Sequence, residues 1–354
     1  MDVSSPLNQD RASIRRVDDP SVLSNILTYA IRDPAGIDIK IPATAEEDFA
    51  YFTPDQTQEI TDYYRENGYA VVRGLVSRDK CEAAMALFDR EVKPADRFIY
   101  RQTTANPERH SFTDHGLMQN PILNIQSLDA RHFPRFQVAG LSVITDPKVQ
   151  AVAREILGEP GKLVQSMYFE GNPSTWAHQD TYYLDAEEIG RMTAAWFAME
   201  DIAPGAGRFF VYPKSHLIDM TKNGGDFDIA FNHDRYKKLV IEIIRRHRLQ
   251  CRAPALRQGD VLFWAAKTIH GSLATTQPQF SRSSFTAHYI PDSSRFLQFQ
   301  ARIRGLTLES VAGMLVHKPK DLNRSSRRAV FWIETNFPTA FRAAKKLAIK
   351  AVTR

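Results

Sequence analysis

Short apolar stretches separated by glycine- and proline-containing turns constrain the fold of this chain more than any other feature. Strands of this length between such turns are typical of β-sandwiches and β-barrels. The sequence therefore predicts a mainly β core, with most of its strands after Lys162. The predicted strands are Leu163–Phe169, Thr193–Glu200, Phe209–Tyr212, Val261–Phe263 and Ser283–Ile290.

Two helices and a strand are predicted ahead of this core. The first helix opens at Thr53-Pro54, because proline suits the first turn of a helix. It ends at Asn67-Gly68, where glycine can terminate a helix. The apolar stretch Tyr69–Val76 follows as a strand. Ser77 is expected to cap the second helix, which runs to about Val92.

Composition agrees with a globular protein that can build a large core. The 354 residues are 43% hydrophobic and 25% charged. Cys81 and Cys251 have no CxxC partner, so the sequence predicts neither a zinc knuckle nor a disulfide framework. Residues 1–10 contain no apolar run of the kind found in secretory signals, and no stretch approaches the length of a membrane span. We therefore expect a protein of the reducing cytoplasm.

The chain divides into three predicted parts. Residues 1–50 mix short polar and apolar pieces with prolines, and we expect an N-terminal arm that is partly ordered against the core. Residues 51–300 form the main domain, with a helical insertion at about 218–250. Within the insertion, Tyr236–Arg248 shows near-helical apolar spacing, so this helix is expected to pack on the barrel or to act as a substrate lid. Residues 301–354 form a basic helical extension.

The extension carries the basic charge of the chain. Lys318–Arg354 contains ten Lys/Arg and two acidic residues, a net charge of +8, so the formal +5 of the whole chain leaves −3 for residues 1–317. Pro338–Arg354 fits an amphipathic helix that could contact an anionic membrane surface or another anionic partner. A solvated terminal helix is the alternative. Nucleic acid is not expected, because no aromatic-basic groove accompanies the tail.

Metal-ligand chemistry is concentrated in His178-Gln179-Asp180 and in the distant His270-Gly271-Ser272. In an extended segment, residues two apart point to the same side, so His178 and Asp180 can share one metal. Two imidazoles and one carboxylate suit a divalent iron that keeps coordination positions open for a bidentate keto acid and dioxygen. Arg282 could bind the far carboxylate of such a diacid. These residues indicate an iron oxygenase dependent on 2-oxoglutarate.

A short His-x-Asp pattern also arises by chance. On the alternative interpretation, His178 is a hydrogen-bonded surface histidine, Asp180 is a turn residue and His270 is a satisfied core histidine. The presence of Ser272 and Arg282 at suitable spacing favours the metal site over this alternative.

The sequence resembles the phytanoyl-CoA dioxygenase-like family of iron and 2-oxoglutarate oxygenases from about Tyr63 to Pro291. The matching stretches are Trp176–Asp180, Ala195–Ile202, Pro213–His216, His270–Ser272 and Arg282–Ser284. The family usually has a glycine-rich run ending in Pro-Gly-Ser-His. Here Lys214 stands in place of that glycine, and Arg208 could alter the pocket entrance. His216 is interpreted as structural, because the ligand set is complete without it.

The resemblance implies a double-stranded β-helix (jelly-roll or cupin-like) core with flanking helices. It also implies that His178, Asp180 and His270 bind iron(II) and that Arg282 binds 2-oxoglutarate. Further cosubstrate contacts would come from Gln179, Trp196, Ser272 and Met167. Dioxygen would complete the reaction. Related halogenases have a small residue where this chain has Asp180, so halogenation is not expected.

The implied activity is hydroxylation of an unactivated C–H bond in a small organic, lipid-like or natural-product substrate, with release of succinate and carbon dioxide. Desaturation, epoxidation or cyclisation on the same site remain open, since they differ only in the fate of the substrate. Alternatives of another class are a zinc hydrolase with the same three ligands and a non-catalytic binding protein on the same fold.

Substrate contacts are predicted from residues near the ligand pair. Trp176, Tyr182 and Tyr183 could line an apolar pocket, and Arg101 or Arg208 could meet an anionic group of the substrate. The segment 95–140 is rich in loops and is expected either to cover the mouth of the barrel or to be a plain solvated loop.

Overall fold

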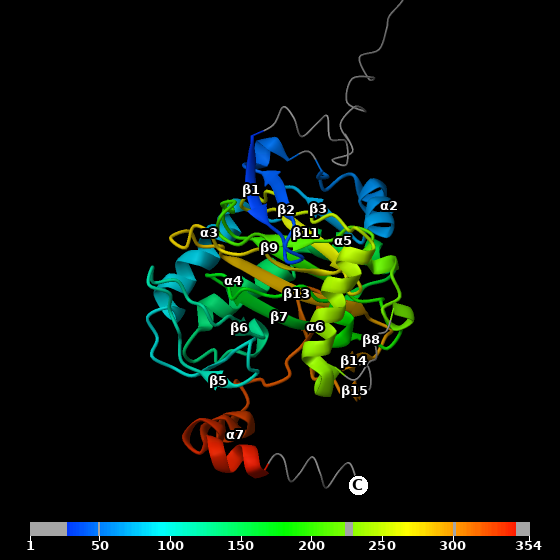
Figure 1. Ribbon diagram of the computed structural model, residues 1–354. Coiled ribbons are helices and arrows are strands. Elements are labelled where there is room, and N and C mark those ends of the chain that lie inside the picture. The colour runs from blue at the N-terminus through cyan, green and yellow to red at the C-terminus, as the bar shows by residue number, and fades with distance from the viewer. Residues whose placement is uncertain (1–26, 49, 224–228, 300–301, 345–354) are drawn as a thin grey trace, which may run out of the picture.

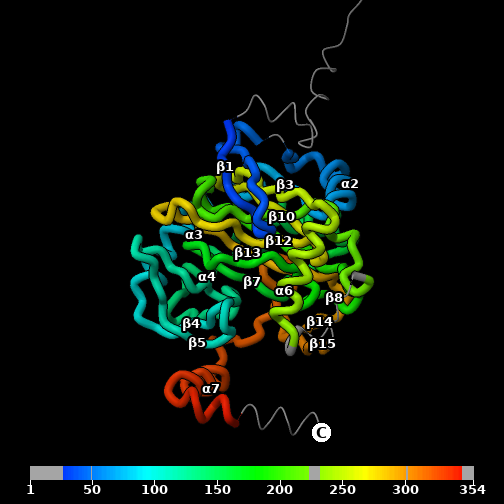
Figure 2. Tube along the Cα trace, in the orientation of Figure 1, coloured from blue at the N-terminus to red at the C-terminus, as the bar shows by residue number. Residues whose placement is uncertain are grey.

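The computed structural model describes residues 27–48, 50–223, 229–299 and 302–344. Figures 1 and 2 show a central β body with helices α2, α3, α4 and α5 around it, α6 across one side, and α7 at the opposite end from the β1–β2 hairpin. The mainly β architecture predicted from the sequence is confirmed. Among the described residues, no helix is both long and apolar enough to span a membrane.

One large sheet forms the main layer of the body. Its strand order is β16-β17-β7-β13-β9-β11-β3, and β6 also pairs with β7. The bounds are β3 Tyr69–Val72, β6 Ile122–Leu123, β7 Gly161–Phe169, β9 Thr193–Ala198, β11 Val261–Ala265, β13 Ser284–Pro291, β16 Leu308–Val311 and β17 Met314–His317. All five strands predicted after Lys162 are present, and each differs from its predicted bounds by one or two residues at an end.

Short pairings build a second layer that faces the large sheet. Strand β10 (Phe209–Val211) pairs with β12 (His270–Ser272), and single bridges add His178 to His270 and Arg252 to Val211. The Phe209 ring lies 4.8 Å from the Trp264 ring of the large sheet, so the two layers are in contact. This arrangement is the double-stranded β-helix expected. A smaller sheet adds β8 Leu184–Ala186, β14 Phe296–Gln298 and β15 Arg302–Arg304.

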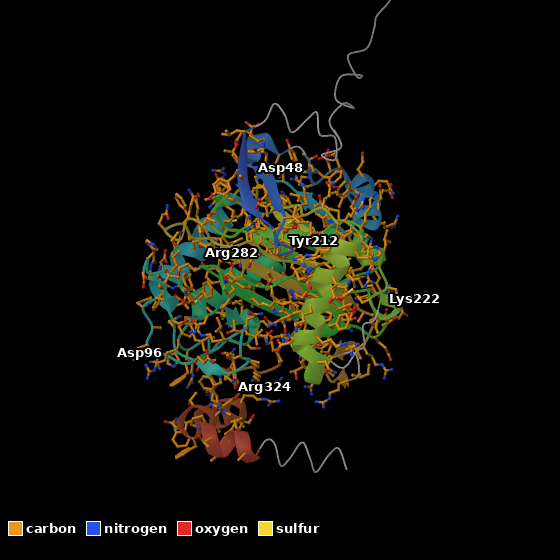
Figure 3. The ribbon with its side chains drawn as sticks, in the orientation of Figure 1. Asp48, Asp96, Tyr212, Lys222, Arg282 and Arg324 are labelled. Carbon is orange, nitrogen blue, oxygen red and sulfur yellow. The ribbon has the colours of Figure 1, made fainter. Side chains whose placement is uncertain are left out.

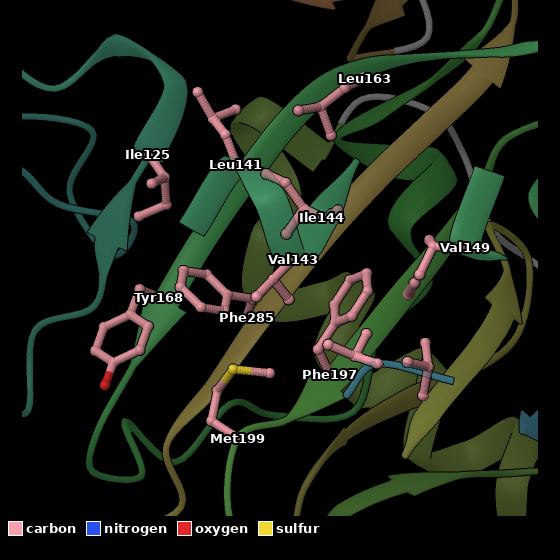
Figure 4. Close-up of a cluster of buried hydrophobic side chains, with 14 of the residues drawn as sticks. Ile125, Leu141, Val143, Ile144, Val149, Leu163, Tyr168, Phe197, Met199 and Phe285 are labelled. Atoms are coloured by element: carbon pink, nitrogen blue, oxygen red, sulfur yellow. The ribbon is translucent and has the colours of Figure 1, made fainter. Parts of the chain in front are cut away.

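Helices cover the outer face of the large sheet. Along β13, Phe285, Ala287 and Tyr289 face this outer core, whereas the alternate residues face the inside of the barrel, as the two-residue period of a strand requires. Figure 4 shows Phe285 and Phe197 among side chains such as Ile144. The helices are α2 Thr57–Asn67, α3 Arg78–Leu87, the π-helix η2 Phe88–Val92, α4 Pro134–Ile144 and α5 Pro147–Leu157.

The helix boundaries follow local sequence signals closely. Gly68 ends α2 in the left-handed conformation, as predicted, although the helix starts at Thr57 rather than at Pro54. Ser77 occupies the N-cap position of α3 without a side-chain capping bond. In α5, the Asp146 carboxylate accepts a hydrogen bond from the Lys148 amide, and this bond stabilises the first turn.

The remaining elements are short pieces at the edges and two further helices. They are β1 Thr28–Arg32, β2 Asp38–Pro42, η1 Ala45–Glu47, β4 Ile99–Tyr100, β5 Pro107–Glu108, η3 Ile125–Ser127, η4 Asp180–Tyr182, η5 Ser215–Leu217, η6 Thr221–Asn223, α6 Ile229–Arg246 and α7 Ser325–Asn336. The part of the predicted arm that the structure describes contacts the core, for example through the Tyr212 hydroxyl, which donates to Asp33. Residues 1–26 lie outside the described residues.

The predicted insertion helix packs beside the metal-ligand segment. Tyr236, Val240 and Ile243 of α6 join a buried cluster with Ala177 and Tyr182. Its Tyr236 hydroxyl accepts the backbone N–H of Gln179 at 3.0 Å. In the C-terminal extension, α7 is followed by helical residues 338–344. The rest of the predicted tail helix, residues 345–354, lies outside the described residues.

Lys214 adopts the left-handed backbone conformation, with φ of 66°, at the turn where the family has glycine. The turn is kept because the Lys214 amide donates to the Asn67 carbonyl. His216 packs against Gly68, and its Nε2 lies 3.0 Å from the Arg65 carbonyl. A Cβ at position 68 would lie only 2.4 Å from the His216 ring, so a glycine is needed there. These contacts agree with a structural role for His216.

Candidate active site

His178 and His270 lie side by side because their backbones pair. Each backbone N–H donates to the carbonyl of the other residue, at 3.0 and 2.9 Å. Gly271 makes this approach possible, since a Cβ there would come within 2.7 Å of the Thr175 carbonyl and 2.9 Å of the Trp176 carbonyl. The local pairing thus brings together two residues that lie far apart in the sequence.

Both imidazoles are oriented by hydrogen bonds to the backbone. The Nδ1 of His178 lies 2.8 Å from the Trp176 carbonyl, and the Nδ1 of His270 lies 2.9 Å from the Thr268 carbonyl. These carbonyls can only accept, so each Nδ1 carries the proton and each Nε2 keeps its lone pair. Both Nε2 atoms lie 3.5 Å from Oδ1 of Asp180. Three ligand atoms therefore converge on one point, as a divalent metal requires.

The two oxygens of Asp180 have different surroundings. Oδ1 faces the two histidines, whereas Oδ2 accepts a hydrogen bond from Trp264 Nε1 at 2.9 Å and lies 3.4 Å from His288 Nε2. Burial alone would raise the pKa of this carboxyl, but His270, His288 and His178 hold it well below the usual range. Burial, reinforced by His270, also lowers the pKa of His178. The site thus favours an ionised Asp180 carboxylate and a neutral His178 imidazole, the forms that bind metals.

Arg282 is a buried cation beside this cluster. It is 2% exposed, and no acidic side chain in the described ranges forms an ion pair with it. Burial without a counter-charge lowers its pKa to about 9. Its guanidinium lies 5.4 Å from the centre of the Phe169 ring, and its Nε has no hydrogen-bond partner. Burying a guanidinium without a counter-charge destabilises the folded protein, unless an anion binds beside it. Figure 3 shows Arg282 within the β body.

Three polar side chains continue the line of Arg282 along the inner face of β13. Ser284 Oγ, Thr286 Oγ1 and His288 Nδ1 are buried, and none of these atoms has a hydrogen-bond partner in the described structure. Arg282, Thr286 and His288 line a small cavity together with the three metal-ligand residues. The cavity therefore offers one positive charge and several unused polar atoms at a position next to the metal site, which fits a dianionic cosubstrate.

The structure brings most of the predicted cosubstrate residues to the small cavity. Trp196, Ser272 and Met167 all line it. Gln179 does not, because its side-chain amide donates to the Lys267 carbonyl and its side chain is 2% exposed. Because successive side chains of an extended segment point to opposite sides, Gln179 points away from the side that His178 and Asp180 share. Its predicted contact with the cosubstrate is therefore not supported by the structure.

A second, larger cavity of about 1380 Å³ meets the small one at the metal site. His178, Asp180 and His288 line both cavities. Of the predicted substrate residues, Trp176 and Tyr183 line the larger cavity. Tyr182 instead packs against Tyr236 of α6, with ring centres 4.2 Å apart, and is absent from the lining of either cavity among the described residues.

Arg101 and Arg208 also lie away from both cavities and have structural contacts. Arg101 is fully buried and donates to the carbonyls of Asn120 and Glu108. Arg208 donates to the carbonyls of Pro42, Ala43 and Ile202, and so connects the arm to the barrel. The prediction that either one meets a substrate anion is therefore corrected, because each guanidinium is buried, donates to backbone carbonyls and lies outside the lining of both cavities.

Sequence reasoning missed several residues of the site. Thr286 and His288 could have been found, since they follow Arg282 at the two-residue period of a strand that the sequence predicted. Trp264 carried no such signal, because its contact with Asp180 depends on how β11 crosses the barrel. From the segment 95–140, Arg97 and Arg131 line the larger cavity.

Comparison with known proteins now decides the family. The profile of the phytanoyl-CoA dioxygenase (PhyH) family matches residues 64–284. The chain belongs to this family. Phytanoyl-CoA dioxygenase domain-containing protein 1 of Bos taurus is 26% identical over 283 residues, 68% of this chain and 90% of that protein. Peroxisomal phytanoyl-CoA dioxygenase of Rattus norvegicus is 24% identical over 302 residues, 77% of this chain and 81% of that protein.

A solved structure shows the same fold. The non-heme alpha-ketoglutarate-dependent carbocyclase SnoK from nogalamycin biosynthesis aligns with a TM-score of 0.52 at 18% identity, and covers 75% of this chain and 99% of that chain. Together, the family and the His178-Asp180-His270 cluster make this protein a 2-oxoglutarate-dependent non-haem iron dioxygenase. The zinc-hydrolase and non-catalytic alternatives lose their support.

Proposed function

We propose that this dioxygenase hydroxylates an unactivated C–H bond of an organic substrate, lipid-like or a natural product, that binds in the larger cavity. One observation carries the proposal: His178 and Asp180 line both cavities. A substrate in the larger cavity and a cosubstrate in the smaller one would therefore meet at the same metal.

The proposed roles follow from the contacts described above. His178, Asp180 and His270 would hold iron(II), and Arg282 would bind the distal carboxylate of 2-oxoglutarate, with Trp196, Ser272 and Met167 around it. When bound, the metal and cosubstrate supply oxidation of the substrate by dioxygen, coupled to decarboxylation of 2-oxoglutarate to succinate.

The protein's own residues position these groups. Trp264 and His288 contact the outer oxygen of Asp180, so the inner oxygen would be the one that holds the metal together with the two histidines. Trp196 and Phe209 form an apolar wall of the small cavity, which excludes water and strengthens the pairing of Arg282 with a carboxylate.

Outcomes other than hydroxylation use the same site. Desaturation, epoxidation or cyclisation would depend on how the substrate is held, and the ligand set does not separate them. Location and partners stay predictions as well: two free cysteines agree with a reducing cytoplasm, and the basic tail could contact an anionic surface.

The proposal is tested by following both products. The full-length protein is incubated with iron(II), 2-oxoglutarate and ¹⁸O₂, together with a panel of amphiphilic organic acids and their uncharged analogues. We expect at least one compound to increase succinate formation and to gain one labelled oxygen atom, as measured by mass spectrometry. The His178→Ala variant should form no succinate above background, whereas His115→Ala, an exposed loop variant, should match the wild type.

Two other results would change the conclusion. A compound that loses two hydrogens without gaining label, while succinate forms, would replace hydroxylation by desaturation or ring closure. Succinate formation that persists in His178→Ala would overturn the assigned metal site.

A further inference from the structure

The end of the larger cavity away from the metal is rich in positive charge. Its lining includes six Lys/Arg side chains, contributed by the loop after η2, the segment before α4, strand β15 and the C-terminal extension. These residues are Arg97, Arg131, Arg304, Lys320, Arg327 and Arg328. Asp96, Asp129 and Asp180 are the acidic residues of the described lining.

The acidic residues neutralise only a small part of this charge. Asp96 pairs with Arg109, Asp129 pairs with Arg131 at 2.6 Å, and Asp180 belongs to the metal site. In the part of the chain that the structure describes, Arg97, Arg304, Arg327 and Arg328 form no ion pair with an acid: Arg304 donates to the Gln298 amide oxygen, and Arg328 donates to the carbonyls of Leu322 and Asn323. The cavity therefore has positive charge available for a ligand.

Apolar rings line the same cavity as the basic residues and the metal site. Tyr100 contacts Phe331 of α7 edge to face, with ring centres 5.3 Å apart, and Lys320 Nζ lies 3.8 Å above the Tyr100 ring. Phe296, Phe133 and Trp176 also line the cavity, and the Trp176 ring centre lies 5.2 Å from that of His178. With a volume of about 1380 Å³, the cavity exceeds the usual 300–1,000 Å³ of small-molecule pockets, so it can hold an extended ligand.

Much of the basic end lies outside the region that matches the family. The family match ends at residue 284, whereas Arg304, Arg327 and Arg328 come later in the chain. Figure 1 shows α7 at the lower end of the body, and Figure 3 places Asp96 and Arg324 toward that same end. The C-terminal extension therefore forms the outer wall of the cavity in this chain.

We propose that the basic end of the larger cavity is a subsite for the phosphate or carboxylate head group of an anionic amphiphile, and that α7 selects the substrate through Arg327 and Arg328. This proposal rests on the proposed function only in naming the ligand a substrate. The apolar part of the ligand would lie along the aromatic lining, with its far end near Asp180.

Binding of a defined probe tests the subsite. Decyl phosphate is titrated into the full-length protein, with and without iron(II) under nitrogen, and tryptophan fluorescence is followed, because Trp176 and Trp332 line the cavity. The uncharged analogue is 1-decanol. The variants are Arg327→Gln/Arg328→Gln on α7 and Arg97→Gln/Arg131→Gln on the opposite segment. Arg302→Gln, which lies on β15 outside the described lining, is the matched control.

We expect wild type and Arg302→Gln to bind decyl phosphate alike, and each double variant to bind it roughly tenfold more weakly, with little change for 1-decanol. Equal affinity of the α7 double variant and the wild type for decyl phosphate would overturn the subsite, and so would equal affinity of wild type for the two probes. Because the metal-free titration needs no iron, wild type that binds decyl phosphate but no metal would contradict the proposed function alone.

Discussion

The smaller cavity is lined mainly by residues on or next to strands of the barrel, whereas the larger cavity is lined mainly by loops, by the small sheet and by α7. Their charges differ too: among the described residues, the smaller one is lined by one guanidinium, that of the buried Arg282, whereas the larger one has several exposed arginines at its outer end. The strand framework fixes a site for a metal and a small cosubstrate, while the loops and the extension are free to fit a substrate particular to this chain.

The largest effect is expected from Asp180→Ala, which removes a ligand from the smaller cavity. Iron(II) affinity should fall by more than about 100-fold, beyond the 10–100-fold loss typical of partners outside the ligand shell. Competition with a chromogenic chelator measures the affinity. Asp129→Asn, in the larger cavity, is the control and should keep wild-type iron affinity. Equal losses of iron(II) affinity in the two variants would show that metal binding does not distinguish the two cavities.

Arg282→Leu should separate cosubstrate binding from stability. Truncating one side of a buried charge pair is expected to weaken 2-oxoglutarate binding roughly 100-fold. Without 2-oxoglutarate, however, the variant should be at least as stable as the wild type, because it removes a buried cation that lacks a counter-charge. Thermal unfolding with and without 2-oxoglutarate measures both effects. A variant that is destabilised yet still stabilised normally by 2-oxoglutarate would argue against the assigned role.

His288→Leu tests a residue that lines both cavities and is not one of the three metal-ligand residues. Since His288 lies 3.4 Å from the outer oxygen of Asp180, its loss should weaken iron binding about tenfold. His288→Gln, which can still donate a hydrogen bond, should recover part of that loss. His317→Leu is the control, because His317 is also buried and lines the larger cavity, but its ring Nδ1 lies against the Thr307 backbone rather than Asp180. Unchanged iron affinity in His288→Leu would show that Trp264 alone holds that oxygen.

The smallest effect on ligand binding is expected from Gln179→Leu, although Gln179 lies between two metal ligands in the sequence. Its amide bonds to the Lys267 carbonyl, so 2-oxoglutarate affinity should stay within about twofold of wild type. The lost bond should instead lower the free energy of unfolding by about 1–3 kcal/mol. Isothermal titration and urea unfolding measure the two quantities, and a large loss of 2-oxoglutarate affinity would return Gln179 to the cosubstrate site.

The sequence predicted the metal-ligand cluster of the smaller cavity, although it missed Thr286 and His288, because the residues of this site follow a local rule. His178 and Asp180 are two apart, and Arg282, Thr286 and His288 continue on one face of a single strand. The ligand chemistry of two histidines and a carboxylate then indicated the metal. The five strands predicted after Lys162 come from the same kind of pattern, which is why the fold class was predicted correctly.

The larger cavity could not be predicted in this way. Arg97, Arg304 and Arg327 come from distant segments that meet only in the folded chain, and none of them stands in a recognisable motif. Arg101 and Arg208 had equal claim from the sequence, but their burial among backbone carbonyls gives them structural contacts instead. Charge alone therefore did not identify the residues that face a ligand.

The most direct test of the assigned site is anaerobic addition of iron(II) and 2-oxoglutarate, followed by visible absorption spectroscopy. Wild type should develop the charge-transfer band of a metal-bound keto acid, His178→Ala should lack it, and Arg282→Leu should need roughly 100-fold more 2-oxoglutarate to reach it. Absence of the band in folded wild type, or an unchanged 2-oxoglutarate titration in Arg282→Leu, would contradict the assignment of the triad and of the buried guanidinium.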